Sequence, residues 1–112
     1  MTTLLIVYIS AGTLLILLSI PLYVGKIPPN PIYGFRVPQT LDNPELWYKV
    51  NRYSARFLML TGLLTILAAV LLYLIPGIRV DAYALGCLAA FSAEFIIGLA
   101  LSFRYMKKVT PP

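Results

Sequence analysis

One carboxylic acid, Glu94, lies inside an apolar run of this sequence, ten residues before the next charged residue, Arg104. An ionised carboxylate in apolar surroundings costs several kcal/mol unless it is paired, protonated or hydrated. Three kinds of chemistry follow: a protonated hydrogen bond between helices, a proton or cation site, or the polar floor of a ligand pocket. We expect the carboxyl group to meet the polar side chains that fall at a similar depth, namely Ser10, Thr13, Thr61, Thr65, Cys87 and Ser92.

A second candidate, Arg36, follows a glycine in a proline-rich segment between two apolar runs. The planar guanidinium group binds two oxygens at once, so it suits a lipid phosphate, a peptide carboxylate or an acidic side chain of a partner. The alternative is a structural clamp on carbonyl groups of the loop or of a helix end. The same choice between ligand binding and structural support applies to the nearby residues Gly34, Thr40, Trp47, Asn51 and Arg52.

The structural alternatives for these neighbours differ from one another. Thr40 can satisfy a backbone group of the loop, and Asn51 can hydrogen-bond to the proline-rich segment. Trp47 can anchor at the membrane interface. Arg52 and Arg56 can face anionic lipid as charges that fix the topology.

Composition excludes several kinds of catalytic site. The chain has no histidine and a single cysteine, Cys87, so it forms neither a histidine zinc site nor an intramolecular disulfide. Its sequence has no glycine-rich phosphate loop, no paired carboxylates and no cluster with metal-ligand spacing. We predict a protein that is not an enzyme and that has no cofactor and no metal site.

Three long apolar runs must position these residues. They cover residues 3–24, 54–75 and 81–103, and each is about 22 residues long. A helix needs about 20 apolar residues to cross the hydrocarbon core of a bilayer, because each residue adds about 1.5 Å. With 60% hydrophobic and 12% charged residues, the chain is predicted to be an all-α membrane protein with three transmembrane helices in a single domain, 1–112.

The connector between the first two runs, residues 25–53, divides into two halves. The first half, which we call the strap (residues 26–39), contains four prolines and is predicted to be ordered, extended or turn-rich, and not helical. The second half is predicted to be an amphipathic helix capped by Asp42 or Asn43, with Pro44 at its first position and Glu45 four residues before Lys49. This helix either lies on the interface or extends the second span.

The charges predict an orientation. Lysine and arginine mark the cytoplasmic side of a membrane protein, and here they gather in two places, around the connector and after the third run: Lys26, Arg36, Lys49, Arg52, Arg56, Arg104, Lys107 and Lys108. We expect the N-terminus outside, and the connector and C-terminus inside, the cytoplasmic membrane. The net charge of +5 then serves topology and contact with anionic head groups rather than nucleic-acid binding. An aromatic belt is expected at the span ends, from Tyr23, Tyr53, Tyr73, Tyr83 and Tyr105.

Small residues recur along the third run: Gly86, Ala89, Ala90, Ala93 and Gly98. Small side chains at four-residue spacing let helices approach closely in a membrane. This stripe serves either internal packing or a face between two copies of the chain. Three short helices leave little interior, so we favour a homo-oligomer.

The connector resembles the signature of the SdpI family, bacterial and archaeal membrane proteins named for immunity to a sporulation-delaying peptide toxin. The matching residues span 27–52. They are a Pro-Asn loop, Gly34-Phe35-Arg36, Pro38, Thr40-Leu41, Trp47 and Asn51-Arg52. Two positions depart from the pattern: Val37 stands where threonine is common, and Ser54-Ala55 replaces a small glycine-rich step.

The resemblance implies a non-enzymatic membrane protein that protects against, or senses, a membrane-active peptide, with relay to a cytoplasmic regulator. The strap and the basic helix would face the regulator. The alternative function is a small transporter, or a module that binds lipid or another ligand in the membrane, with Glu94 as the coupling or binding group.

Overall fold

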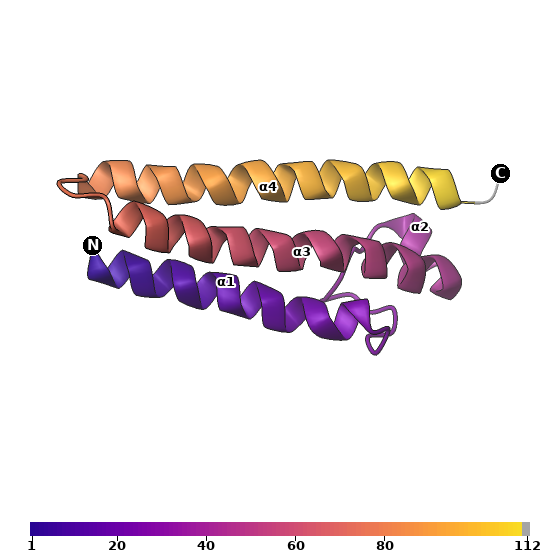
Figure 1. Cartoon of the computed structure of the whole chain (residues 1–112). Helices are drawn as coiled ribbons and strands as arrows, with labels where there is room; N and C mark the ends of the chain where they lie inside the picture. Colours follow the sequence, from indigo (N-terminus) through magenta and orange to yellow (C-terminus); the bar gives the residue numbers. More distant parts are fainter. Residues whose placement is uncertain (111–112) are drawn as a thin grey trace.

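Three long helices lie side by side along an elongated molecule (Figure 1). The computed structural model describes residues 1–110, and its Cα atoms extend over 55 × 23 × 19 Å. Within that range the helices are α1 (Thr2–Tyr23), α2 (Pro38–Leu41), α3 (Pro44–Tyr73) and α4 (Val80–Val109). α1, α3 and α4 are each long and apolar enough to cross a membrane, which confirms the predicted all-α class with three transmembrane helices.

The second predicted span and the amphipathic helix before it form one continuous helix, α3, of 30 residues. The Asn43 side chain caps this helix by accepting a hydrogen bond from the Leu46 amide at 3.2 Å, and Pro44 occupies the first helical position. A 30-residue helix is about 45 Å long, which exceeds the roughly 30 Å of the hydrocarbon core. The first turns of α3 therefore project beyond the apolar layer, together with the last turns of α4.

The strap contains the start of a short helix, which its proline content had led us not to expect. Its last two residues, Pro38 and Gln39, begin the one-turn helix α2, where we expected no helix. Proline is compatible with the first position of a helix because the amide hydrogen it lacks has no partner there in any case. α2 lies beside the first turns of α3, at the same end of the molecule as the C-terminus of α4 (Figure 1).

Helices α1 and α3 pack closely against each other at a pair of glycines. A Cβ atom added to Gly12 would lie 2.6 Å from the Gly62 carbonyl oxygen, and one added to Gly62 would lie 2.5 Å from the Gly12 carbonyl oxygen. On α4, Gly98 faces Phe57 of α3, whereas Ala89 and Ala93 are exposed. A Cβ atom added to Gly86, the other glycine of the predicted stripe, would lie 2.9 Å from the Leu72 side chain of α3, so both glycines serve internal packing, and the homo-oligomer stays a prediction.

At the end opposite the strap, tyrosines join the three helices. The Tyr83 hydroxyl donates to the Ala69 carbonyl at 2.9 Å, and the Tyr8 hydroxyl donates to the Ala84 carbonyl at 3.0 Å. Tyr83 is fully buried, so it is not part of an aromatic belt as we expected. Cys87 is buried in the same cluster.

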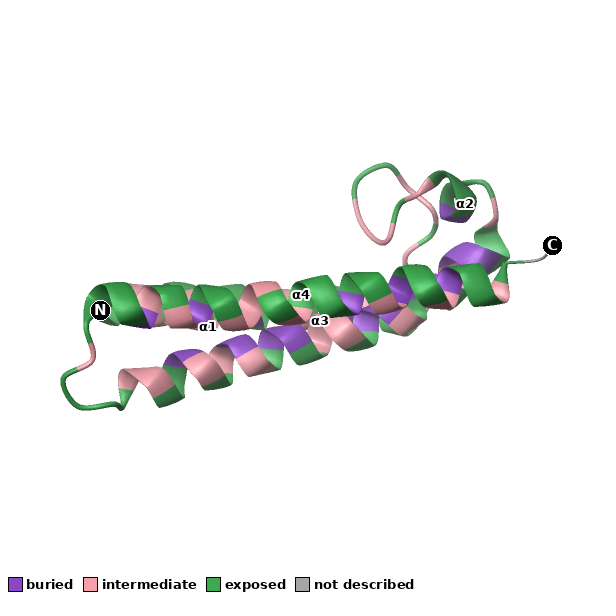
Figure 2. Cartoon of the chain, turned by 90° about the horizontal axis from the view of Figure 1, so that it is seen from above, coloured by how far each residue is buried: buried purple, intermediate pink, exposed green. Residues whose placement is uncertain are grey.

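The buried residues of α3 lie along the faces that contact its neighbouring helices (Figure 2). Residues that face another helix are buried, whereas the outward faces carry exposed aliphatic side chains such as Leu17 (59% exposed), Leu71 (62%) and Leu85 (65%). Water would make such surfaces unfavourable, but lipid tails solvate them, so this pattern agrees with a multi-pass membrane protein.

Candidate functional site

The strap is folded around one asparagine. The Asn30 side-chain oxygen accepts hydrogen bonds from the amides of Ile32 (3.0 Å) and Tyr33 (2.6 Å), and its nitrogen donates to the carbonyls of Pro28 (2.8 Å) and Tyr33 (2.9 Å). Asparagine forms such turns because its short amide reaches the backbone two or three residues away. The sequence showed Asn30 only as part of a Pro-Asn loop, and this organising role was not predicted.

Two side chains of α3 hold the strap in place. The Trp47 indole nitrogen donates to the Ile27 carbonyl at 2.8 Å, and the Asn51 side-chain oxygen accepts from the Phe35 amide at 2.6 Å. Both side chains are buried, with 0% and 1% of their surfaces exposed. Asn51 therefore bonds to the strap, as its structural alternative predicted, and Trp47 is buried beneath the strap, so its predicted contact with the membrane interface stays a prediction.

Gly34 is required where the strap crosses α3. Its φ of +118° is a conformation that other residues rarely adopt. A Cβ atom at this position would also lie 2.9 Å from the Asn51 side-chain oxygen and from the Trp47 ring. Only glycine allows the backbone to approach these two side chains so closely.

The Thr40 hydroxyl closes the strap against α2. It lies 2.8 Å from the Phe35 carbonyl and 3.0 Å from the Val37 carbonyl, and it accepts a hydrogen bond from the Val37 amide at 3.1 Å. The residue is fully buried. This matches the prediction that Thr40 satisfies backbone groups of the loop.

The two predicted arginines bond to backbone carbonyls while their side chains remain exposed. Arg36 donates to the Pro31 carbonyl within the strap, and Arg52 donates through Nε to the Tyr23 carbonyl at the end of α1, at 3.0 Å. Arg36 thus makes the kind of bond that its structural alternative predicted, a clamp on a carbonyl group of the loop. The strap end of the molecule brings together six of the predicted site residues: Gly34, Arg36, Thr40, Trp47, Asn51 and Arg52.

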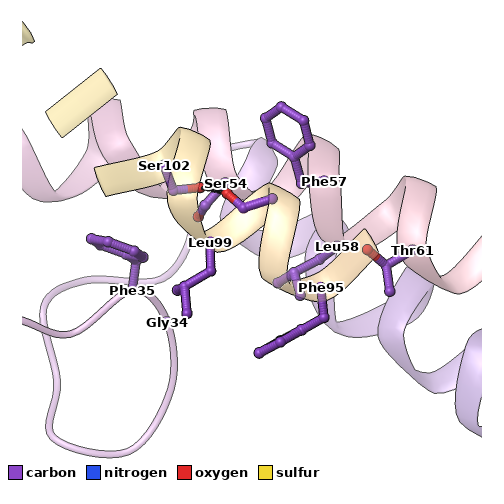
Figure 3. Close-up of a pocket in the computed structure, with 10 residues that line it drawn as sticks. Gly34, Phe35, Ser54, Phe57, Leu58, Thr61, Phe95, Leu99 and Ser102 are labelled. Carbon is purple, nitrogen blue, oxygen red and sulfur yellow. Dashed lines mark hydrogen bonds between the residues drawn. The ribbon is translucent and has the colours of Figure 1, made fainter. Parts of the chain in front are cut away.

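A cavity of about 140 Å³ lies beneath the strap, between α3 and α4 (Figure 3). Its lining is mainly apolar. The two serine hydroxyls that line it are already bonded within their own helices, Ser102 to the Gly98 carbonyl at 2.7 Å and Ser54 to the Asn51 carbonyl at 3.3 Å. The pocket is partly open at its side, and its volume is close to the roughly 150 Å³ of an apolar cavity that accepts benzene. The lining residues are Gly34, Phe35, Ser54, Phe57, Leu58, Thr61, Phe95, Gly98, Leu99 and Ser102.

Sequence reasoning missed this cavity. Gly34 and Thr61 of its lining had been named as candidate polar or binding residues, whereas Gly98 was assigned to helix packing and Phe35 and Ser54 were noted only in the family comparison. The others are apolar or small residues that the composition assigns to lipid contact or helix packing. The one available signal was Phe35 of the glycine-phenylalanine-arginine motif, whose ring packs edge-on against Phe103 of α4 at a centroid distance of 4.9 Å.

Glu94 does not belong to the strap cluster. Gly98 of α4 faces Phe57, and Cys87 packs with Ala69, so the antiparallel register sets Glu94 level with Thr61 and Thr65 of α3. Within residues 1–110, Glu94 Oε2 and Thr65 Oγ1 are buried without a hydrogen-bond partner. We call Glu94, Thr61 and Thr65 the midspan seam.

The predicted polar cluster around Glu94 is smaller than expected. Ser10 and Thr13 are exposed on α1 and face away from the seam, because the buried face of α1 carries Gly12 and Ser19. Cys87 lies two helical turns from Glu94 and packs against Tyr83 and Ala69 instead. The described residues contain no group of three acidic or cysteine side chains that would hold a metal ion.

These features define a class of protein: a three-helix membrane unit whose first connector is a hydrogen-bonded strap seated on the central helix. Residues 26–103, which are 78 of the 112 residues, match the model of the SdpI/YfhL protein family, and the chain belongs to this family. The matched range begins at the strap and ends at Phe103, which packs on it.

One curated relative is similar over part of its length. A protein of Bacillus subtilis (strain 168) that carries the name "Uncharacterized protein YfhL" is 36% identical over 55 residues. The match covers 46% of this chain and 48% of that protein, so the chain aligns with about half of the relative's length. No solved structure matches the chain.

Proposed function

We propose that this chain is a non-enzymatic protein of the cytoplasmic membrane that protects against, or senses, a membrane-active peptide and relays the event to a cytoplasmic regulator. The observation that supports it is the apolar cavity roofed by the strap. A membrane-active peptide presents apolar side chains from within the bilayer, and the cavity between α3 and α4 has the size and lining to accept one.

A connection from this cavity to water runs through the strap. Gly34 and Phe35 line the cavity, and the Phe35 amide donates a hydrogen bond to the Asn51 side-chain oxygen at 2.6 Å. Asn51 in turn donates to the Trp47 carbonyl at 2.9 Å, on the part of α3 that projects beyond the apolar layer. A side chain that entered the cavity would press on Phe35 and so act on this projecting segment, which is the surface we assign to the regulator.

A survival assay tests the proposal. Cells with and without the protein are exposed to a panel of membrane-active peptides, and we expect the protein to raise survival against at least one of them. Ser54→Leu fills the cavity and should abolish protection, whereas Ala93→Leu adds the same side chain on an exposed face of α4 and should not. Equal protection by the two variants, both shown to be folded by thermal unfolding, would contradict the proposal.

The orientation has its own test. The excess of lysine and arginine at the strap end supports a cytoplasmic strap and C-terminus. A cysteine introduced at Lys107 in a Cys87→Ser background should react with a membrane-impermeant thiol reagent only after the cells are opened. Labelling in intact cells would place the strap outside.

A second candidate function, a small transporter, is favoured by the midspan seam. The seam buries Glu94 Oε2 and Thr65 Oγ1 without partners among the described residues, so both oxygens are available to a proton or a small cation. The test is a pH-dependent flux of ions in proteoliposomes. A flux that depends on the protein and is lost in Glu94→Gln would favour this candidate, and the absence of any flux would eliminate it.

A further inference from the structure

A stripe on α3, separate from the strap and the seam, combines cations with exposed leucines. Lys49, Arg52 and Arg56 are spaced at three and four residues, and the same helical line continues through exposed Leu60 (47%), Leu63 (47%) and Leu67 (45%). Side chains with this spacing lie on one face of a helix. The stripe therefore has a cationic end and an apolar end, as the head and tail of an anionic phospholipid do.

The cationic end is hollowed. A notch of about 490 Å³ is formed by the projecting part of α3 and by one residue of α4. Two of its tyrosines, Tyr53 and Tyr105, stack with their ring centroids 4.1 Å apart and their planes 6° apart. The lining residues are Glu45, Tyr48, Lys49, Arg52, Tyr53, Arg56 and Tyr105.

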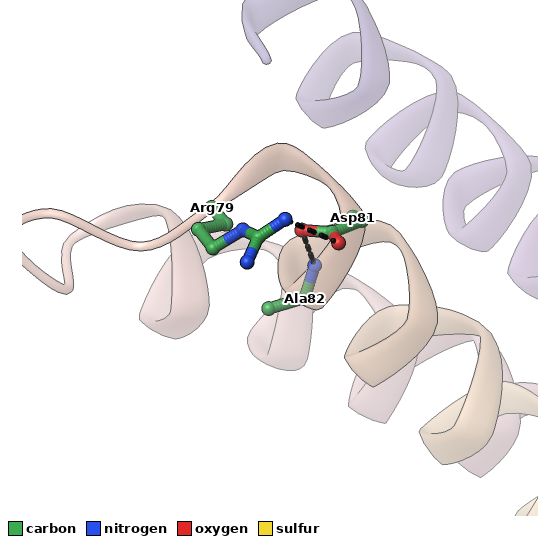
Figure 4. A network of polar contacts seen from close by, with 3 residues as sticks. All are labelled: Arg79, Asp81 and Ala82. Atoms are coloured by element: carbon green, nitrogen blue, oxygen red, sulfur yellow. Dashed lines mark hydrogen bonds and ion pairs between the residues drawn. The ribbon is translucent and has the colours of Figure 1, made fainter.

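The notch holds three cations and one carboxylate, that of Glu45, so its side chains carry a net positive charge, and none of the cations is in an ion pair among the described residues. Within residues 1–110 the one ion pair is Arg79–Asp81 at 3.2 Å, at the opposite end of the molecule (Figure 4). The expected pair between Glu45 and Lys49 does not form. Arg52 uses Nε for the Tyr23 carbonyl at 3.0 Å, and that bond holds its guanidinium group in place at the notch.

The notch lies at the depth of lipid head groups. Arg52 bonds to Tyr23, the last residue of α1, and the Arg56 guanidinium lies over the Tyr23 ring, 5.8 Å from its centroid. α1 carries no charged residue, so we take its end as the border of the hydrocarbon layer. From Arg56 to Leu67 the helix rises about 16 Å, which is close to the half-thickness of about 15 Å that an acyl chain occupies.

We propose that this stripe binds one anionic phospholipid. The phosphate group lies in the notch between Arg52 and Arg56, because guanidinium groups bind phosphate oxygens in pairs. Lys49, one turn further from the membrane, attracts the remaining negative charge of the head group. An acyl chain follows Leu60, Leu63 and Leu67 toward the middle of the bilayer.

The experiment measures lipid binding to the purified full chain in a neutral detergent, by native mass spectrometry. We compare phosphatidylglycerol with phosphatidylcholine of the same chain length. The double variant Lys49→Gln/Arg56→Gln should weaken phosphatidylglycerol binding about twenty-fivefold, since each cation at a membrane surface contributes about fivefold. It spares Arg52, whose bond to Tyr23 also supports the fold.

The matched control is Lys107→Gln/Lys108→Gln, which removes the same charge from the end of α4 and should change binding less than twofold. Equal losses in the two double variants would show attraction to net charge alone and overturn the proposal, as would equal binding of the two lipids. Leu63→Gln tests the acyl-chain path and should also weaken binding. Soluble glycerol phosphate should not compete, and effective competition would show a phosphate site without a lipid tail.

Discussion

The strap end and the midspan seam differ in whether their buried polar side chains have hydrogen-bond partners. At the strap end, the side chains of Trp47, Asn51 and Thr40 all bond to strap backbone. In the seam, Glu94 and Thr65 bury oxygens that have no partner within residues 1–110. A satisfied polar network fixes one structure, whereas an unsatisfied buried group costs free energy and commonly marks a functional role. These bonds favour a structural role for the three strap-end side chains, and the unpaired oxygens of the seam are the observation behind the second candidate function.

One side chain at the strap end does not follow this rule. The Tyr33 hydroxyl is buried without a partner among the described residues. Burial raises the pKa of Tyr33 above its usual value, so this group stays neutral at physiological pH. Tyr33 and Thr65 are thus both neutral hydroxyls buried without a partner, and the contrast between the two regions rests on Glu94, whose carboxyl group costs more to bury unpaired.

The largest expected effect is that of Gly34→Ala. The added Cβ atom would collide with Asn51 and Trp47 in a backbone conformation that alanine avoids, so we expect the free energy of unfolding to fall by about 3 kcal/mol or more. Trp47 is the only tryptophan, so its fluorescence during thermal unfolding in detergent reports on the strap directly. In the folded variant the emission should shift to longer wavelength as water reaches the ring.

Gly77→Ala is the control for this change. Gly77 also has a positive φ, of +73°, but a Cβ atom there would meet nothing within 4 Å. We expect a loss of about 1 kcal/mol from the backbone alone and an unchanged emission of Trp47. Equal losses for the two glycines would show that the strap does not pack on Trp47 and Asn51 as described.

Asn51→Ala comes next in size. It leaves the Phe35 amide without an acceptor and the Trp47 carbonyl without a side-chain donor, so we expect a loss of about 2 kcal/mol in the same unfolding measurement. Ser54→Ala, one turn further along the helix, removes a hydroxyl that bonds only to its own helix and should cost much less. If the two variants were equally stable, the strap would not depend on Asn51.

A matched pair of threonines tests the contrast itself. Thr40 and Thr65 are both buried, with 0% and 1% of their surfaces exposed, but only the Thr40 hydroxyl has partners. Thr40→Val should lower the free energy of unfolding by about 1–2 kcal/mol, whereas Thr65→Val should leave it unchanged or raise it slightly. Parallel melting curves of the two variants decide the point. The same loss at both positions would mean that the seam is bonded as fully as the strap.

The sequence predicted the parts of this molecule that depend on local chemistry. The three spans follow from apolar length, and the start of α3 from the order Asn43-Pro44. The roles of Thr40 and Asn51 were also open to inference, because a proline-rich loop has backbone groups that need partners. Each of these features can be predicted from the order of residues along the chain, or from the residues that lie next to a single loop.

The remaining features depend on how the helices are rotated about their axes. Ser10 and Thr13 were placed beside Glu94 because their depth agrees, but α1 turns Gly12 toward α3 and so directs both residues outward. The depth of a residue in the membrane follows from counting residues along its helix. The rotation of the helix about its axis depends on which side chains pack against the neighbouring helix. Hydropathy does not reveal that rotation, because in a membrane every face of a helix is apolar. The cavity was missed for the same reason, because it arises where Phe57 and Gly98 meet between two such faces.

The smallest expected effect on stability, and the sharpest test of the seam, is Glu94→Gln. The amide has nearly the size of a protonated carboxyl group and can also donate and accept hydrogen bonds. We therefore expect the free energy of unfolding to change by less than about 0.5 kcal/mol, well below the changes expected for Gly34 and Asn51. A large loss of stability would show that an ionised Glu94 has a partner that the seam does not reveal.

The activity of the same variant then separates the two roles of the seam. A protonated Glu94 that only packs between helices can be replaced by glutamine with no loss of activity. A Glu94 that takes up and releases a proton cannot, because glutamine has no proton to exchange, so the fold would remain while a pH-dependent activity disappeared. We expect the second result, since an oxygen buried without a partner serves packing poorly. Full activity at unchanged stability would eliminate ion coupling, and the strap-roofed cavity would remain as the functional site.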